Sequence, residues 1–162
     1  DRNLGNYINS LTGRNMKLWN GARMVHEKFI VAKLVGLKKQ YPQAEVLAHP
    51  ECKKNLLILA DKIGSTKALL DYAIASPCKQ FIVVTESGIL YEMRRACPDK
   101  EFIPAPADDS TCACNECAYM RLNTLEKLYL CLKYEQPEIK ISRELCERAV
   151  RPINRMLELS KK

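Results

Sequence analysis

Short apolar runs alternate with amphipathic stretches along this chain of 162 residues. Continuous apolar runs are typical of strands that are buried on both faces. The sequence predicts such strands at 44–48, 81–84 and 102–104, and a further short strand at 16–19. Apolar residues at helical spacing, bounded by caps, glycine or proline, predict helices between the strands. These helices are expected at 2–12, 27–41, 53–63, 67–76, 88–97, 123–134 and from 142 onward, and Pro152 is expected to kink or restart the last one.

Strands that alternate with helices predict an α/β fold, here a three-layer αβα domain in which helices cover both faces of a short parallel sheet. In such sheets, ligands bind beyond the carboxyl ends of the strands. Polar motifs follow the predicted strands at these ends: Gly21 to His26, His49-Pro50-Glu51, Thr85-Glu86 and the cysteine loop 105–118. The sequence has no G-x-G-x-x-G or Walker motif, so nucleotide binding is not predicted.

His49 and Glu51 flank Pro50 directly after a predicted buried strand. A histidine and a carboxylate at this spacing can share acid–base work on one substrate. The alternative is a histidine that only closes a turn. Both interpretations remain open on the local sequence.

Two other strand-end features are candidates for binding. Ser65 and Thr66 follow Gly64 and open a predicted helix, where free N–H groups and two hydroxyls can hold a carboxylate or phosphate. The same residues can equally serve as an ordinary N-cap. His26 is either a core histidine or a pocket residue, and the sequence does not decide between the two.

Cys112, Cys114 and Cys117 lie within six residues of one another. Thiolates are ligands for zinc and for iron–sulfur clusters. A closed zinc site usually needs a second ligand pair nearby, and only the single residues Cys97 and Cys131 are close in sequence. The C-x-x-C pair also lacks the strand–motif–helix setting of a thioredoxin-type redox site. A closed zinc site and a redox pair are therefore poorly supported, and the loop is expected either to bind nothing or to supply one ligand to a cluster whose other ligands lie elsewhere.

The composition, 47% hydrophobic and 28% charged, suits a chain that buries a core. The net charge is +7, but the basic residues are scattered, which favours a solvated surface or anionic substrates over nucleic acid. No apolar run is long enough to span a membrane. The chain is expected to be cytoplasmic, and its eight irregularly spaced cysteines then favour reduced thiols and metal binding over disulfides. Because the chain begins at Asp1 in a patterned helix, we expect it to be a fragment.

A series of short motifs runs through nearly the whole chain. They are Asp1-Arg2-Asn3-Leu4-Gly5, Trp19-x-Gly21-x-x-x-Val25-His26, His49-Pro50-Glu51-Cys52, Gly64-Ser65-Thr66, Thr85-Glu86, Cys112-x-Cys114-x-x-Cys117-x-Tyr119-Met120 and Asn123-x-Leu125. Each motif is modest by itself, but in this order and combination they resemble the C-terminal half of quinolinate synthase.

The resemblance implies three similar α/β domains around a pseudo-threefold axis. Residues 1–22 would end the second domain, 23–117 would form the third, and 118–162 would form a C-terminal helical segment that packs on the first. It implies a [4Fe–4S] cluster with one cysteine ligand from each domain. The implied activity is a transferase reaction that joins iminoaspartate to dihydroxyacetone phosphate, giving quinolinate for NAD biosynthesis, downstream of an aspartate-oxidising enzyme. No nucleic-acid or membrane partner is implied.

The resemblance also assigns roles to residues. Cys117 would be the metal ligand of the third domain, and His49 and Glu51 would be catalytic, with Glu51 as the acid–base group. The substrate-binding residues would be His49, Glu51, Thr66, Ser65 and His26. We therefore expect His49, Glu51, Thr66 and Cys117 to converge on one pocket.

Two positions depart from the family pattern. In W-x-G-x-C-x-V-H the cysteine is an expected cluster ligand, and here Arg23 occupies that position. A guanidinium is always cationic and cannot replace a thiolate. If Arg23 points inward, the cost of an unpaired buried charge requires an acidic partner or access to solvent. The second departure, Ala118 in place of proline, is minor.

Three functions are compatible with these features. The first is quinolinate synthase, and the second is a cluster-less relative that binds a carboxylate metabolite without turnover. The third is a zinc-binding interaction module built on Cys112, Cys114 and Cys117. After the cysteine loop the pattern is helical only, so residues 119–162 are not expected to complete the sheet. Six apolar residues there should be exposed: Leu128, Leu130, Leu132, Ile153, Met156 and Leu157.

Overall fold

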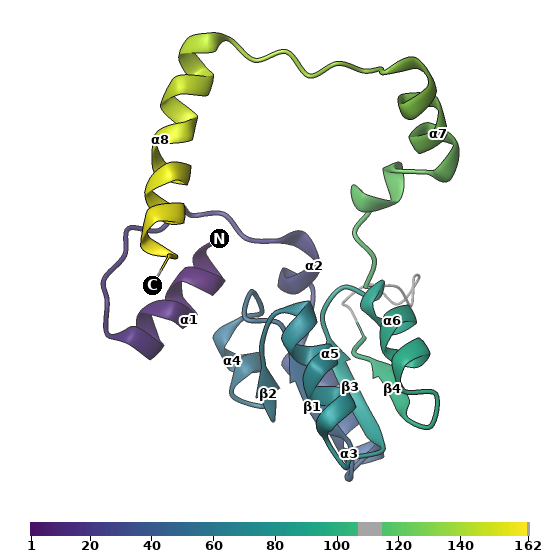
Figure 1. The fold of residues 1–162 in the computed structure, drawn as a ribbon. Helices are drawn as coiled ribbons and strands as arrows, with labels where there is room; N and C mark the ends of the chain where they lie inside the picture. The colour runs from purple at the N-terminus through teal and green to yellow at the C-terminus, as the bar shows by residue number, and fades with distance from the viewer. Residues whose placement is uncertain (107–114, 162) are drawn as a thin grey trace. The chain divides into compact units, whose positions relative to one another are not determined.

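A computed structural model describes residues 1–106 and 115–161 (Figure 1). The cysteine positions Cys112 and Cys114 lie outside the described residues. The chain divides into two compact units, Asp1–Arg121 and Leu122–Lys162, and each is described by itself below.

The first unit is built on a four-stranded sheet in the order β2-β1-β3-β4. Its strands are β1 (Glu45–Ala48), β2 (Lys62–Ile63), β3 (Gln80–Val84) and β4 (Glu101–Pro104). All neighbouring strands are parallel, with Ala48 opposite both Ile63 and Val84, and Val83 opposite Pro104. This arrangement confirms the predicted α/β class with a parallel sheet.

Alternate residues of the central strands bury their side chains on opposite faces of the sheet. One face carries Val46, Ala48, Ile82 and Val84, and it packs against α2 (Met24–Glu27), α3 (Val31–Gln40) and α4 (Lys54–Leu57). The other face carries Leu47, Phe81 and Val83, and it packs against α5 (Thr66–Ala75) and α6 (Ile89–Ala96). In Figure 1, α5 and α6 lie in front of the sheet and α3 lies behind it. Both faces are therefore covered, as the continuous apolar strands require.

Helix α1 (Arg2–Thr12) begins and ends as predicted. Its N-cap is Asp1, whose carboxylate accepts the N–H of Leu4, and its C-cap Gly13 has a φ of 66°. A positive φ at a helix end is the conformation that glycine adopts without steric cost.

The strand predicted at 16–19 is wrong, because these residues pack along α1 instead of joining the sheet. Met16 donates its N–H to Oδ1 of Asn9 at 3.0 Å. The side chain of Leu18 lies so close to Gly5 that a Cβ at Gly5 would be 2.2 Å from it. Local sequence alone could not show this contact with a preceding helix.

Two predicted helices are also shorter than expected. The helix predicted at 53–63 ends at Leu57, and the chain then forms β2. The cause lies in Asp61, whose carboxylate accepts the N–H of Val46 at 2.7 Å while its own N–H donates to the carbonyl of Val46 at 2.9 Å. The helix predicted at 27–41 begins only at Val31, as α3, because Phe29 turns into the core between α2 and α3, with 3% of its surface exposed.

The described residues of the second unit form helices joined by a non-helical segment and contain no strand, as predicted. A short 3-10 turn at Met120–Leu122 precedes α7 (Leu125–Tyr134) and α8 (Arg143–Leu159), and α8 continues through Pro152. The N-cap of α7 is Thr124, whose hydroxyl accepts the N–H of Lys127, so the helix begins after the predicted start at residue 123. The six apolar residues expected to be exposed are all exposed, from 40% for Leu130 to 74% for Leu132.

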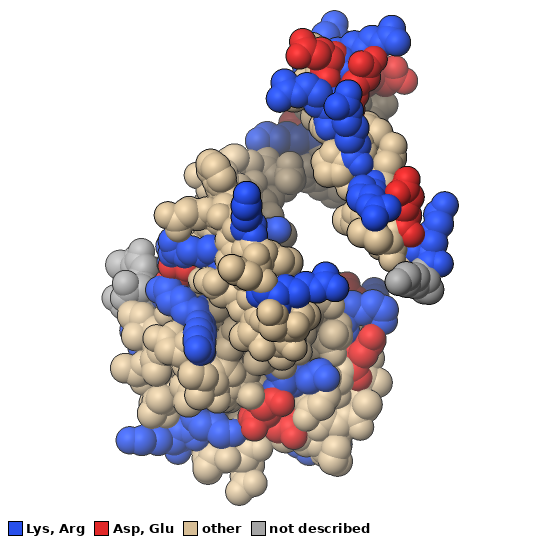
Figure 2. Space-filling view, turned by 90° about the vertical axis from the view of Figure 1, so that its left-hand side faces the viewer, with Lys and Arg blue, Asp and Glu red and all other residues tan. Residues whose placement is uncertain are grey.

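The surface charge is dispersed. On the face shown in Figure 2, Lys and Arg side chains are interspersed with Asp, Glu and uncharged residues and form no single patch. Among the described helices, none is both long and apolar enough to cross a membrane.

Candidate active site at the carboxyl edge of the sheet

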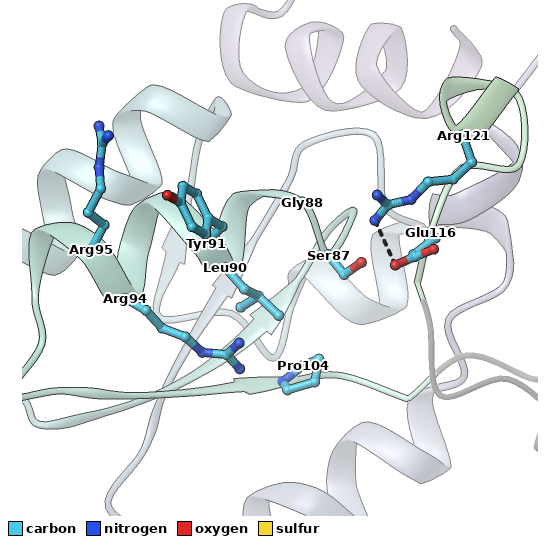
Figure 3. Close-up of a pocket in the computed structure, with 9 residues that line it drawn as sticks. All are labelled: Ser87, Gly88, Leu90, Tyr91, Arg94, Arg95, Pro104, Glu116 and Arg121. Carbon is cyan, nitrogen blue, oxygen red and sulfur yellow. Dashed lines mark hydrogen bonds and ion pairs between the residues drawn. The ribbon is translucent and has the colours of Figure 1, made fainter. Parts of the chain in front are cut away.

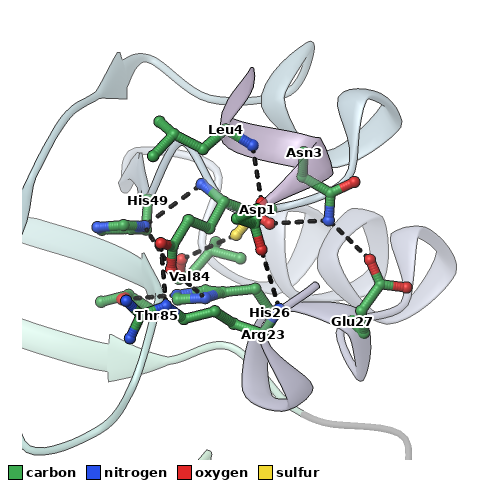
Figure 4. Close-up of polar contacts among 11 residues, drawn as sticks. Asp1, Asn3, Leu4, Arg23, His26, Glu27, His49, Val84 and Thr85 are labelled. Carbon is green, nitrogen blue, oxygen red and sulfur yellow. Dashed lines mark hydrogen bonds and ion pairs between the residues drawn. The ribbon is translucent and has the colours of Figure 1, made fainter. Parts of the chain in front are cut away.

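Polar residues gather where β1 and β3 end (Figure 4). His49 follows β1 directly, and its N–H still donates to the carbonyl of Val84 at 3.2 Å. Thr85 follows β3 and is 2% exposed. Because parallel strands end at the same edge, side chains from distant parts of the sequence meet there, as the fold class predicts.

His26 and Glu51 form the buried centre of this group. His26 comes from α2 and is 6% exposed, and its Nε2 lies 3.1 Å from the hydroxyl of Thr85. Its Nδ1 lies 3.2 Å from Oε2 of Glu51 but is not aligned for a hydrogen bond with any described residue. His26 is therefore a buried histidine whose two ring nitrogens lie against Thr85 and the candidate acid–base group, and its role in binding substrate stays a prediction.

His49 lies against the same carboxylate. Its ring stacks on His26 with 4.8 Å between centroids and an interplanar angle of 15°. The N–H of Glu51 donates to Nδ1 of His49 at 3.3 Å, which assigns the proton of the neutral imidazole to Nε2. The same Nδ1 is 3.6 Å from Oε2 of Glu51. His49 thus keeps one N–H donor that the carboxylate does not use.

Arg23 pairs with the other oxygen of Glu51. Its Nε lies 3.0 Å from Oε1, and 69% of its side chain is exposed against 8% for Glu51. The backbone N–H of Arg23 donates to the carboxylate of Asp1 at 3.0 Å. The prediction that this arginine has an acidic partner or reaches solvent is confirmed on both counts.

Both imidazoles are held neutral. Burial, followed by the charges of His49 and Arg23, lowers the pKa of His26 from 6.5 to about 4. Burial also lowers the pKa of His49, although Glu51 acts in the opposite direction. Beside them, burial raises the pKa of Cys52 to about 12, so this thiol is an inert part of the core.

A second group of polar residues holds the backbone of Glu51 in place. Asn3 of α1 donates its amide to the carbonyl of Glu51 at 3.0 Å and to the Glu27 carboxylate at 2.7 Å. Glu27 also pairs with Arg2 and Lys53 at 3.3 and 3.7 Å. The role of Asn3 was not predicted from the sequence. The only signal was its place in the opening Asp-Arg-Asn motif.

Ser65 and Thr66 lie at the same edge, at the start of α5. The N–H of Gly64 donates to the carbonyl of Ala48 at 3.2 Å, which places them beside the end of β1. Ser65 is the N-cap of α5, because its hydroxyl accepts the N–H of Ala68. Both side chains are exposed, and their binding role stays a prediction.

Cys117 is half-buried and packs on the face of the sheet that α2 covers. Its N–H donates to Oε1 of Glu86 at 3.4 Å. The predicted convergence of this thiol with His49, Glu51 and Thr66 on one pocket stays a prediction. The assignments that involve Cys112 and Cys114 fall outside the described residues.

The donor set could also hold a metal ion. One nitrogen each from His26 and His49 and one oxygen from Glu51 lie within 4.8 Å of one another. Two neutral imidazoles and a carboxylate are common ligands of divalent transition metals. The pairing of Glu51 with Arg23 works against this use, because the guanidinium already neutralises the carboxylate.

A pocket that the sequence did not predict lies beside another helix. A pocket of about 820 Å³ opens beside α6, with arginines Arg94, Arg95 and Arg121 among its lining residues (Figure 3). Arg121 is held by Glu116 at 2.6 Å. The arginines are far apart in sequence or spaced as helix neighbours, so no local motif indicated them.

The fold and the edge site together define an α/β protein with a histidine–carboxylate centre at the ends of its parallel strands. The family model of the quinolinate synthetase A protein matches residues 1–158, and the chain belongs to this family. The quinolinate synthase of Chloroherpeton thalassium is 60% identical over 161 residues, which are 99% of this chain and 50% of that relative. Those of a Synechococcus species and of Microcystis aeruginosa are each 55% identical over 160 residues, with the same coverage.

The chain thus spans about half the length of the curated relatives it matches. The family resemblance predicted from the motifs is confirmed. The comparisons lend no support to the alternative of a cluster-less relative.

Proposed function

We propose that this chain forms the C-terminal half of a quinolinate synthase, which condenses iminoaspartate with dihydroxyacetone phosphate in cytoplasmic NAD biosynthesis. The observation that carries the proposal is the contact of His26, His49 and Glu51 at the sheet edge, within a chain of this family. An aspartate-oxidising enzyme would supply the first substrate.

In this proposal Glu51 is the acid–base group. Its carboxylate is 8% exposed, and its backbone is fixed by Asn3 and by the N–H bond to His49, so its position is set before substrate binds. Condensation of an imine with a ketone or aldehyde phosphate, followed by loss of water, requires repeated proton transfers at carbon and oxygen. A carboxylate beside two neutral imidazoles can accept and return these protons.

The substrates carry carboxylates and a phosphate, and the edge offers donors for them. The Nε2–H of His49 is not used by Glu51, and the first turn of α5 presents backbone N–H groups with the hydroxyls of Ser65 and Thr66. We assign substrate binding to His26, His49, Ser65 and Thr66.

The [4Fe–4S] cluster implied by the family fits this chain at one position and not at another. Cys117 offers a half-buried thiol whose backbone is hydrogen-bonded at the sheet edge, and it is the proposed ligand. Arg23 stands where a second cysteine ligand is expected, and a guanidinium cannot bind iron. The residues of this chain therefore do not complete their share of the site, and no step above depends on the cluster.

A chimera tests the function. The N-terminal half of the Chloroherpeton thalassium relative would be joined to this chain at Asp1, with Arg23 replaced by cysteine so that the missing ligand is present. After anaerobic reconstitution, we expect quinolinate from iminoaspartate and dihydroxyacetone phosphate, measured by chromatography. The change Glu51→Gln should lower the rate by at least about a hundredfold, the usual scale for loss of a general acid–base.

Glu138→Gln is the matched control, because Glu138 lies in the second unit and is exposed. It should leave the rate unchanged. The proposal fails if the Arg23→Cys chimera holds iron and forms no quinolinate while the intact relative does. It also fails in its assignment of Glu51 if Glu51→Gln is as active as the control.

A further inference from the structure

The turn that follows β3 contacts both sides of the candidate site. Thr85 places its hydroxyl 3.1 Å from Nε2 of His26. The next residue, Glu86, lies against Cys117, whose N–H donates to Oε1 at 3.4 Å. Two consecutive residues of one turn thus contact the proposed substrate histidine and the proposed thiol ligand.

Glu86 shares its carboxylate between two backbone donors. Oε2 accepts the N–H of Gly88 at 2.7 Å, immediately before α6, and Oε1 accepts from Cys117. An ionised carboxylate forms stronger hydrogen bonds to backbone N–H groups than a neutral acceptor does. The side chain therefore joins the segment that carries Cys117 to the start of a helix that is anchored in the core.

A second set of contacts runs beside Glu86. Ser87 donates its N–H to the carbonyl of Asn115 at 3.1 Å, and the Asn115 amide donates to the carbonyl of Ala105. Asn115 is 3% exposed, and its Oδ1 is buried without a partner among the described residues. These two hydrogen bonds join the segment that carries Cys117 to the turn after β3 and to the residue that follows β4.

We propose that Glu86 is a positioning residue, which fixes the backbone of Cys117 so that its thiol is presented at the carboxyl edge of the sheet. The role of Cys117 as a ligand rests on the proposed function. The positioning of Cys117 by Glu86 rests on the hydrogen-bond geometry and not on that function. Apolar contacts hold the cysteine against the core face that includes Val84 and Ala105. The hydrogen bond that the Cys117 N–H donates to Oε1 of Glu86 fixes the direction of this N–H, which limits where Cα and Sγ can lie.

Gly88 supplies an independent way to disturb the same contact. A Cβ at Gly88 would lie 2.7 Å from Oε2 of Glu86. The φ of Gly88 is −58°, so alanine is compatible with its backbone. Gly88→Ala should therefore act by displacing the flexible end of Glu86 and not by straining the turn.

The test measures thiol reactivity in the 162-residue chain. Cys112 and Cys114 are replaced by serine, and alkylation by iodoacetamide is followed at each remaining cysteine by peptide mass spectrometry. Buried Cys52 and Cys97 report global unfolding, and exposed Cys131 gives the rate for an accessible thiol. We expect Glu86→Ala and Gly88→Ala to raise the rate at Cys117 about tenfold, the scale of losing a charge-assisted hydrogen bond.

Glu86→Gln keeps one acceptor and should give an intermediate rate. Glu92→Ala, an exposed glutamate of α6, is the matched control and should leave Cys117 unchanged. The proposal is overturned if Glu86→Ala leaves Cys117 at the parent rate. It is equally overturned if Cys52 and Cys97 become reactive in step with Cys117, since Glu86 would then only support the fold. Neither result depends on quinolinate formation, so failure of the proposed function is seen separately in the chimera.

Discussion

The Nε of Arg23 lies 3.0 Å from Oε1 of Glu51, which joins the one unexpected residue of the site to its proposed acid–base group. The arginine is 69% exposed, so solvent screens the pair and its contribution to stability is small. The main effect of Arg23 is on the charge of the site. With both histidines neutral, the guanidinium balances the single negative charge of the buried centre.

The protonation of His26 predicts a pH dependence of stability. Its pKa is about 4 in the folded chain and 6.5 when unfolded, so between these values the unfolded chain binds a proton that the folded chain does not. The stability contribution is fully present above pH 6.5 and is lost as the pH falls toward 4. The loss should be on the order of 3 kcal/mol, with a further loss of the same sign from His49.

Urea unfolding followed by circular dichroism between pH 7 and pH 4, in buffer with EDTA, measures this dependence. The change His26→Gln removes the titrating group but can keep a hydrogen bond to Thr85. The variant should show a clearly shallower fall in the free energy of unfolding. An unchanged slope would mean that other groups control the acid sensitivity.

A leucine-to-alanine change, made once in each unit, compares the buried core of the first unit with the exposed surface of the second. Leu69 of α5 is fully buried between the helix and the sheet, whereas Leu132 of α7 is 74% exposed. Leu69→Ala should lower the free energy of unfolding of the first unit by about 2–5 kcal/mol, because it opens a cavity. Leu132→Ala should change it by less than about 0.5 kcal/mol. Hydrogen exchange resolved by unit measures both, and a large effect of Leu132→Ala on the first unit would contradict the division described above.

The part of the fold that the sequence predicted well is the part that apolar runs specify. Strands β1 and β3 are continuous apolar segments and lie where they were expected. Strand β2 was missed because Lys62 and Ile63 carry no strand pattern, and their pairing depends on Asp61 reaching Val46. Tertiary contacts of this kind leave no periodic signal.

In the candidate site, too, contacts between residues that are distant in sequence could not be predicted. His49 and Glu51 were predicted because a polar motif directly follows a buried strand, and the need of Arg23 for an acidic partner follows from charge alone. The support that Asn3 gives to Glu51 joins residues 48 positions apart, and only the fold brings them together. The environment of His26 was undecided for the same reason, since its partners are Thr85 and Glu51.

The cysteine assignments can be tested in the Arg23→Cys chimera. The proposed ligand is Cys117, and Cys112 and Cys114 are predicted not to bind iron. Serine at both of these positions should leave the iron content of the reconstituted chimera nearly unchanged. Cys117→Ser should lower it by at least half. If the double variant loses its iron and Cys117→Ser does not, the assignment is wrong.

The last prediction concerns Arg23 itself. A cationic side chain at an expected thiolate position should prevent the cluster from forming in the parent chimera, because it removes one ligand and places a positive charge at the site. We expect the parent to hold at least fivefold less iron than the Arg23→Cys chimera and to form correspondingly little quinolinate. Absorption near 400 nm and iron analysis measure the iron content, and chromatography measures the quinolinate formed.

Arg23→Ser is the matched control for that change, because it removes the same guanidinium without supplying a thiol. It should release Glu51 from the ion pair and still hold little iron. If the parent already holds about four irons per chain and forms quinolinate, another ligand serves and the interpretation of position 23 is wrong. If Arg23→Ser gains as much activity as Arg23→Cys, the obstacle is the pairing of the guanidinium with Glu51 and not the missing thiolate. A gain of both iron and activity in Arg23→Cys alone identifies Arg23 as the residue that prevents the cluster from forming.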